Sequence, residues 1–404
     1  MTASQATGAR VRGLSPENGV KALFFSYFGL VGAFSPYLSL YFAAVGLSIT
    51  QIGVLMAMPQ VVRIFGPPFW GWLADALDRR LLPLRISAVA AVVCAGAVWL
   101  AGGDYLWLVL VLGALFFATS AQAPLAESIA LTVAGGDAGR YGQMRLWGSI
   151  GFVLAVAVTG PVLDRIGVAR LPAVLLACCL MLAAVAWMVP EAARRSDAVA
   201  RPVWRMLGRP VPALFFLGNF LMLFAHAALY AFYSLHLDRL GFSKTAIGMI
   251  WTLGVLAEIV LFRVQRPLFE RFGALPLLSF SLAVAALRFA LIGWGGASLV
   301  LIVVTQLMHA VTFGVHHSAV MALLHRWFAP AQQGRAQALY AVTGYGLGGS
   351  LGGLGASLLW DGVSPAAAFY GAAVAAALGW GAVELCRRLD YARPLGHMDS
   401  EVRQ

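Results

Sequence analysis

Apolar stretches of about 20 residues alternate with short polar segments along almost the whole chain. A helix of roughly 20 apolar residues spans the hydrocarbon core of a bilayer, because each residue adds about 1.5 Å along the helix axis. The pattern therefore predicts twelve transmembrane helices. We place them at residues 21–45, 52–73, 83–101, 106–132, 141–163, 171–190, 213–236, 246–265, 275–294, 299–321, 337–360 and 366–386.

The longest polar stretch between these helices divides them six and six. Two halves of equal helix number are typical of transporters whose halves enclose a site near the membrane midplane. We therefore predict an all-α membrane protein built from two pseudo-symmetric six-helix bundles. Its parts are a cytoplasmic tail at 1–20, an N-terminal bundle at 21–190, a cytoplasmic central loop at 191–212, a C-terminal bundle at 213–386 and a second cytoplasmic tail at 387–404.

The composition explains which solvent the chain needs and how it is oriented. Hydrophobic residues make up 61% of the chain and charged residues 11%, against about 25% charged in soluble domains, so the protein requires a lipid bilayer. The net charge of +11 does not predict nucleic-acid binding, because the basic residues lie in short loops without interleaved aromatics. Loops rich in Lys and Arg stay in the cytoplasm. The outer loops hold only Arg165, Arg170, Arg239 and Lys244, which predicts cytoplasmic termini in a bacterial inner membrane.

Six chargeable side chains lie inside the predicted helices, namely Arg63, Glu127, Arg145, Glu258, Arg288 and His309. A charge at bilayer depth costs about 2.5 to 3.5 kcal/mol on insertion scales, so such groups normally pair or line a solute pathway. Glu127 and Arg145 lie at matched depth near the cytoplasmic ends of neighbouring helices, which predicts an ion pair. The other four lie near the bilayer centre and predict a binding site there. A pair that only ties two helices together is the alternative for Glu127 and Arg145.

The signs of these charges favour an anion as the transported molecule. Three arginines against two glutamates leave a net charge of +1 when His309 is neutral, which one bound carboxylate would neutralise. Protonation of Glu258 would raise this charge and strengthen anion binding, so proton and anion would each favour binding of the other. The charges therefore indicate proton symport, with Glu258 and His309 as the proton relay and Arg63, Arg145 and Arg288 as anion ligands.

Several other residues are ambiguous. His226 is a candidate for proton transfer and Tyr230 a candidate for an aromatic pocket, with helix packing as the alternative for both. The glycine-rich run at residues 344–355 lies inside an apolar span and lacks a following Lys-Ser or Lys-Thr, so it predicts close helix packing rather than a nucleotide site. His316 and His317 face different sides of one helix without a neighbouring acid, which argues against a metal site. We expect no cofactor, with the proton gradient as energy source.

The loop after the second predicted helix, at residues 71–80, resembles the loop signature of the major facilitator superfamily. Gly71, Asp75, Arg79 and Arg80 match that pattern, whereas Asp78 stands where the pattern has glycine. The equivalent place after the eighth helix holds a similar run at residues 266–273, which supports an internal repeat. The resemblance implies that this loop stabilises one conformation through charge and helix-end contacts.

Five further runs resemble the phenylpropionic acid transporter branch of this superfamily, a group of proton symporters related to lactose permease. The resemblance implies substrate roles for Glu127 and Arg145 and roles in substrate binding and proton coupling for Glu258, Arg288 and His309. Thr312 and Gln306 depart from the permease pattern, in which an acid and a lysine occupy these positions, so a lactose-type mechanism is not implied. The runs are residues 62–66, 145–152, 226–230, 254–258 and 307–309.

We predict that the protein is not an enzyme but a monomeric, proton-coupled importer of a small organic anion, such as 3-phenylpropionate. Three alternatives stay open on the sequence. The chain could be a proton-coupled symporter of sugars or nucleosides, or a proton antiporter that exports drugs or metabolites. A membrane-embedded enzyme or sensor is the third.

Overall fold

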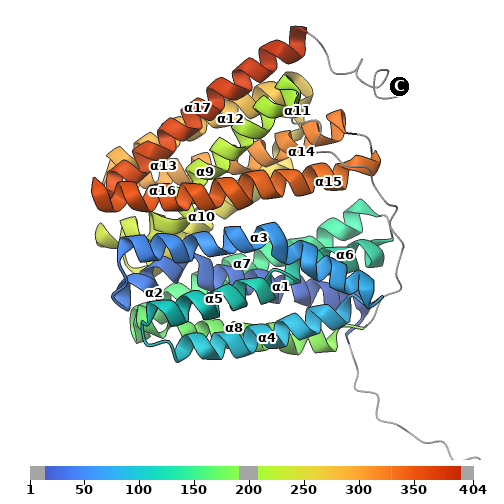
Figure 1. Cartoon of the computed structure of the whole chain (residues 1–404), viewed down its shortest axis with the longest axis vertical. Coiled ribbons are helices and arrows are strands. Elements are labelled where there is room, and N and C mark those ends of the chain that lie inside the picture. The colour runs from blue at the N-terminus through green and yellow to red at the C-terminus, as the bar shows by residue number, and fades with distance from the viewer. Residues whose placement is uncertain (1–13, 136, 191–207, 329, 393–404) are drawn as a thin grey trace, which may run out of the picture.

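The computed structural model describes residues 14–135, 137–190, 208–328 and 330–392, and this part of the chain is helical without any strand. Figure 1 shows two helical bundles, the N-terminal half in blue to green and the C-terminal half in yellow to red. The predicted all-α architecture of two six-helix bundles is confirmed.

The N-terminal bundle contains six spans, two of which are interrupted. The first runs through α1, a short 3-10 turn and α2, and the fourth is broken between α5 and α6 at Ser120 and Ala121. In chain order the elements are α1 (Pro16–Phe34), η1 (Ser35–Tyr37), α2 (Leu38–Ala44), α3 (Ile49–Ala76), α4 (Leu81–Trp99), α5 (Tyr105–Thr119), α6 (Gln122–Ala134), α7 (Ala138–Ile166), η2 (Val168–Arg170) and α8 (Leu171–Met188).

The C-terminal bundle repeats this plan with two differences. Spans ten and eleven each contain a π-helical segment, η4 and η5, near their middle. Such segments are rare and occur frequently at functional sites. The elements are α9 (Pro210–Arg239), α10 (Lys244–Val264), α11 (Arg266–Phe272), α12 (Ala274–Gly295), α13 (Leu299–His309), η4 (Ala310–Val315), α14 (His316–Trp327), α15 (Pro330–Tyr340), η5 (Ala341–Gly348), α16 (Gly349–Gly362) and α17 (Pro365–Ala392).

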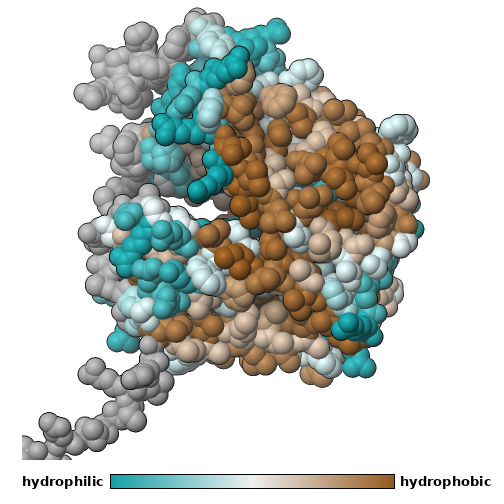
Figure 2. Space-filling model, turned by 180° about the vertical axis from the view of Figure 1, so that it is seen from behind, coloured by the Kyte–Doolittle hydropathy of each residue, from teal (hydrophilic) through white to brown (hydrophobic). Residues whose placement is uncertain are grey.

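Eleven of the described helical runs are long and apolar enough to cross a membrane. The one remaining span, the eleventh in chain order, consists of α15, η5 and α16, and its first part, Pro330–Tyr340, carries polar residues on a continuous helical path. Figure 2 shows the expected surface, an apolar band between two hydrophilic ends.

Helices α1, α9 and α17 extend beyond the predicted apolar runs, the first of them from a capped end. Ser15 accepts a hydrogen bond from the amide of Asn18 and Pro16 occupies the first turn, so α1 begins five residues before the predicted span. At the other end, α17 continues to Ala392, into the predicted tail at 387–404, and α9 begins inside the predicted loop at 191–212. The rest of the two tails and of the central loop lies outside the described residues.

The glycine-rich run packs closely against α9, as predicted. A Cβ atom at Gly352 would overlap the backbone of Phe224, and one at Gly348 would lie 2.7 Å from the carbonyl oxygen of Phe220. Because these positions have no side chain, the eleventh span can pack closely against the seventh. This packing places the π-helical segment η5 beside the interface between the bundles.

The two bundles are joined at the face opposite the chain termini. The carboxylate of Asp164, on α7, accepts hydrogen bonds from the amides of Lys244 and Thr245, on α10, at 2.9 Å each. Tyr37 donates its hydroxyl to the carbonyl of Val156 at 3.0 Å and lies against Gly248, where any side chain would overlap it. At the end near the termini, Figure 2 shows a cleft between the bundles.

Candidate functional site

Arg288 organises a buried cluster inside the C-terminal bundle. It lies on α12 and is fully buried. Its Nε donates to the carbonyl of Thr305 at 2.7 Å, and its Nη1 lies 3.0 Å from the Thr312 hydroxyl and 3.1 Å from Nδ1 of His309. Thr312, where lactose permease has an acid, is therefore a neutral hydrogen-bond partner of this guanidinium.

The contact with Arg288 determines which nitrogen of His309 carries a proton. A guanidinium can only donate, so Nδ1 of His309 accepts and must be unprotonated. The ring proton then lies on Nε2, which faces the carboxylate of Glu258 at 3.9 Å. This distance lies within ion-pair range but exceeds that of a direct hydrogen bond. His309 ends α13 where the π-helical segment η4 begins, so irregular helix geometry positions the ring.

His226, a candidate for proton transfer, lies next to this cluster. Its ring centroid is 6.3 Å from that of His309 and 5.1 Å from that of Phe289. Nδ1 lies 3.0 Å from the carbonyl of Met222, one turn earlier on α9, whereas the buried Nε2 has no hydrogen-bond partner among the described residues. His226 therefore presents an unused acceptor beside the Arg288 cluster.

The predicted ion pair between Glu127 and Arg145 is wrong. Among the described residues, no ion pair within 4.0 Å joins these two side chains. The guanidinium of Arg145 instead lies over the rings of Phe28 at 4.1 Å and Phe24 at 5.5 Å. Matched depth on neighbouring helices did not predict this arrangement, because aromatic faces of α1 offer a closer site for a planar cation.

Glu127 and Arg145 lie on α6 and α7 of the N-terminal bundle, whereas Glu258 lies on α10 of the C-terminal bundle, which packs against α7. The grouping of the charges by depth into a cytoplasmic pair and a midplane group stays a prediction.

Arg63 contacts the opposite bundle. It lies on α3, is exposed, and its guanidinium carbon is 4.7 Å from the centroid of the Tyr345 ring on η5. Next to Tyr345, Tyr230 of α9 stacks on Trp251 of α10 with ring centroids 6.2 Å apart and planes 17° apart. The site thus combines an accessible cation with flat aromatic faces.

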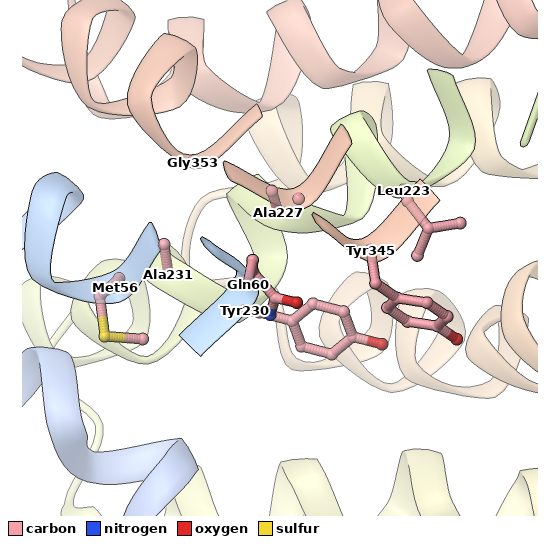
Figure 3. Close-up of a pocket in the computed structure, with 9 residues that line it drawn as sticks. Met56, Gln60, Leu223, Ala227, Tyr230, Ala231, Tyr345 and Gly353 are labelled. Carbon is pink, nitrogen blue, oxygen red and sulfur yellow. The ribbon is translucent and has the colours of Figure 1, made fainter. Parts of the chain in front are cut away.

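Figure 3 shows a pocket between the bundles, in which the rings of Tyr230 and Tyr345 lie next to each other with hydroxyls pointing the same way. Met56 and Gln60 from α3 complete the lining on the N-terminal side. The sequence predicted Tyr230 but missed the other three. Gln60 could have been recognised, because it is a polar residue within an apolar span, three residues before Arg63. Tyr345 was missed because it lies within the glycine-rich run, which predicted only helix packing.

The loop signature after α3 has a defined geometry. Arg80 donates from Nη1 to the hydroxyl of Thr132 at 2.8 Å and lies 3.3 Å from the carbonyl of Ser128, so it ties this loop to α6. Asp78 adopts φ of 51°, the left-handed conformation that explains glycine at this position of the pattern. Gly71 lies within α3 and Arg79 is exposed, while Asp75 is in the last turn of α3.

The histidines of span ten do not form a metal site. His316 is held between the Ser281 hydroxyl at 3.1 Å and the Asn219 side-chain oxygen at 3.0 Å. Across the described part of the chain, no group of three or more His, Cys, Asp or Glu side chains is arranged to hold a metal ion. The Asn219–His316–Ser281 contacts instead link α9, α14 and α12.

Comparison with known families defines what kind of protein this is. The family model of the MFS_1 like family matches residues 19–371, most of the chain. The chain belongs to this family of the major facilitator superfamily. It is therefore a multi-pass membrane transporter rather than an enzyme, and a small-molecule substrate is implied.

Named relatives agree with this assignment. The chain is 31% identical over 345 residues to the probable 3-phenylpropionic acid transporter of Escherichia coli (strain K12), which covers 81% of this chain and 86% of that protein. It is 29% identical over 329 residues to the maltose permease of Geobacillus stearothermophilus, covering 80% and 83%. The crystal structure of a mutant of the nucleoside transporter NupG superimposes with a TM-score of 0.82 at 18% identity, covering 92% of this chain and 100% of that one.

Proposed function

We propose that this transporter is a proton-coupled symporter that imports a small aromatic carboxylate, such as 3-phenylpropionate, by alternating access. The observation that carries the proposal is the contact of the exposed Arg63 with Tyr345 across the cleft, beside the Glu258–His309 pair. The identity to the probable 3-phenylpropionic acid transporter supports the substrate class.

The carboxylate of the substrate would bind Arg63, with Arg145 beside it. Guanidinium groups bind carboxylates through two parallel hydrogen bonds. Both arginines lie over aromatic rings, and binding of a carboxylate does not require these ring contacts to break. The aromatic ring of the substrate would pack against Tyr230 and Tyr345. Glu127 supplies a compensating negative charge. Arg288 is fully buried with three acceptors, so we assign it to holding His309 rather than to direct contact with the anion.

Glu258 would carry the proton. Arg288 occupies Nδ1 of His309, so a second proton on that ring would face a guanidinium at 3.1 Å, whereas the carboxylate of Glu258 has no such restriction. Protonation of Glu258 removes one negative charge from the cluster and strengthens anion binding. By linkage, a bound anion strengthens proton binding to the same degree. We assign His226 and His309 to the route by which this proton would leave.

The bundles meet at the face opposite the termini and are apart at the other end. With cytoplasmic termini, as the distribution of Arg and Lys predicts, this is an inward-facing state. The contacts of Asp164 and Tyr37 would then be the ones that break when the cleft opens to the outside.

Uptake of labelled 3-phenylpropionate into proteoliposomes tests the proposal directly. An imposed inward proton gradient should drive accumulation above the external concentration, and a protonophore should abolish it. Uptake that does not respond to the gradient would remove the coupling, and the absence of any uptake or exchange would remove the substrate class.

A sugar is the second candidate substrate, because the maltose permease of Geobacillus stearothermophilus is 29% identical. The cation-rich cleft argues against a neutral sugar, since it would leave the excess positive charge unpaired. Competition against labelled substrate by phenylpropionate, maltose and a nucleoside would separate the candidates. Efflux of substrate driven by an inward proton gradient would identify an exporter.

A further inference from the structure

The pocket between the bundles (Figure 3) contains a polar side chain to which the proposed function gives no role. Gln60 lies on α3, one helical turn before Arg63, and lines the pocket together with Tyr230 and Tyr345. These three lining residues have hydrogen-bonding side chains, whereas the rest of the lining is methionine, leucine, alanine and glycine. The amide of Gln60 therefore lies in a mostly apolar environment.

Close packing against the opposite bundle positions the side chain of Gln60. A Cβ atom at Gly349, on α16, would lie 3.0 Å from Cγ and 3.3 Å from Cδ of Gln60. One turn later on α3, Ile64 packs in the same way, because a Cβ atom at Gly346 would lie 2.6 Å from its Cγ1. These contacts limit the directions in which the amide of Gln60 can turn.

The oxygen of this amide is available for a hydrogen bond. Oε1 of Gln60 is buried, and within the described part of the chain it has no hydrogen-bond partner. Such an oxygen raises the free energy of the protein, because it has lost water without gaining another donor. The tyrosines do not supply one: the hydroxyl of Tyr345 lies beside that of Tyr340, and in Figure 3 the hydroxyls of Tyr230 and Tyr345 point away from the amide. A donor that enters the pocket would therefore be bound by Gln60.

The space in this pocket fits a small polar substituent rather than a whole substrate. The pocket has room for a group about the size of a water molecule. It adjoins the anion site, because Tyr345 both lines the pocket and lies 4.7 Å from the guanidinium carbon of Arg63. A hydroxyl group both donates and accepts hydrogen bonds, so it matches either orientation of a side-chain amide.

We propose that Gln60 binds a hydroxyl group on the aromatic ring of the substrate, so that the preferred substrates are hydroxylated arylpropionates, such as 3-(4-hydroxyphenyl)propionate. The inference rests on the proposed function, in which Arg63 binds the carboxylate. Met56, Gln60 and Arg63 follow one another on the same face of α3, and the flexible thioether of Met56 would pack beside the ring. A site that hydrogen-bonds a substrate hydroxyl discriminates against the analogue without it, because the protein group is then left unpaired.

Competition in proteoliposomes tests this preference. Uptake of labelled 3-phenylpropionate is measured in the presence of unlabelled 3-phenylpropionate, 3-(3-hydroxyphenyl)propionate or 3-(4-hydroxyphenyl)propionate. For the wild-type protein, at least one hydroxylated acid should compete about 10-fold more strongly than phenylpropionate itself. Equal inhibition constants for the three acids would overturn the inference and would mean that Gln60 binds only water.

Gln60→Met tests whether this residue causes the preference. Methionine has a similar length and volume but does not bind a hydroxyl strongly, so the inhibition constant of the hydroxylated acid should rise about 10-fold, while the KM for phenylpropionate stays the same or falls. A defect in folding would instead affect all the acids alike.

The matched control is Gln265→Met. Oε1 of Gln265 is also buried without a partner among the described residues, but Gln265 lies at the junction of α10 and α11, outside the pocket lining. A hydroxyl preference that survives in Gln60→Met, or that disappears equally in Gln265→Met, would overturn the role of Gln60.

The same measurements separate this inference from the proposed function. If none of the arylpropionates is taken up or exchanged, the proposed function fails and the inference fails with it. If phenylpropionate accumulates but the hydroxylated acids show no advantage, transport of aromatic carboxylates stands and only the role of Gln60 fails.

Discussion

The carboxylate of Asp164 caps the first turn of α10 through Thr245, accepting from its amide at 2.9 Å and from its hydroxyl at 2.6 Å. The two residues belong to different bundles, so this helix cap exists only while the bundles are joined at the face opposite the termini. An acid at a helix N-terminus also interacts favourably with the helix dipole. The cap therefore stabilises the conformation that the structure shows.

Replacement of Asp164 by alanine should shift the equilibrium toward the state that opens at this face. Loss of a helix cap costs about 1 kcal/mol, and because Asp164 is exposed we expect a shift of ~5-fold in population. Spin labels on Arg170 and Ser298, exposed residues of the two bundles at this end, would report the change as longer distances in pulsed EPR.

Asp238→Ala is the matched control for this experiment. Asp238 pairs with Lys244 at 2.8 Å at the same face, but both residues lie in the C-terminal bundle. Its removal should leave the distance distribution unchanged. Equal shifts in both variants would mean that the Asp164 contact does not control the opening.

Arg63→Gln should raise the KM for phenylpropionate by about 10-fold or more, because a hydrogen bond to a charged group contributes about 1.5 to 3 kcal/mol. Arg63→Lys should recover only part of this loss, since lysine keeps the charge but not the planar contact with Tyr345. Initial rates of uptake at several substrate concentrations measure the effect. Arg165→Gln, an exposed cation far from the cleft, is the control, and an unchanged KM in Arg63→Gln would exclude Arg63 as an anion ligand.

Glu258→Gln should abolish accumulation driven by a proton gradient while exchange of labelled for unlabelled substrate continues. The amide has nearly the same shape as the protonated carboxyl, so the site stays in its anion-binding form and cannot release a proton. Uptake and exchange measured in the same proteoliposomes separate the two effects. Glu270→Gln on the exposed α11, where Glu270 pairs with Arg266, should change neither rate. Gradient-driven accumulation that survives Glu258→Gln would assign the proton to another group.

The left-handed conformation of Asp78 in the loop signature can be tested by measuring the stability of variants. Asp78→Gly should be tolerated, because glycine adopts a φ of 51° without steric cost. Asp78→Val should lower the stability by about 1 to 2 kcal/mol, since a β-branched residue is disfavoured in the left-handed conformation. Thermal unfolding in detergent would show a lower Tm for the valine variant alone. Leu77→Val, at a neighbouring exposed position with ordinary helical dihedrals, is the control.

The sequence alone determined the class of fold, because helix length and apolarity are local properties that a bilayer fixes. Twelve spans and close packing of the glycine-rich run both followed from this, whereas the division at residues 191–212 stays a prediction. The helix ends at Pro16 and Ala392 did not, since caps and polar turns extend helices beyond the hydrocarbon core. The conformation of Asp78 could be inferred only from the place of glycine in the loop pattern.

For the site, as for the fold, the sequence determined one part and the tertiary structure another. The sequence identified Arg63, Glu127, Arg145, His226, Glu258, Arg288 and His309, because a charged or titratable group in an apolar span is visible without any structure. Which groups meet was decided by the tertiary structure. Rotation of each helix about its axis turned Arg145 toward Phe28 instead of Glu127, and placed Arg63 against Tyr345 of the other bundle. Depth along a helix can be counted from a sequence, but the direction of a side chain depends on how twelve helices pack together.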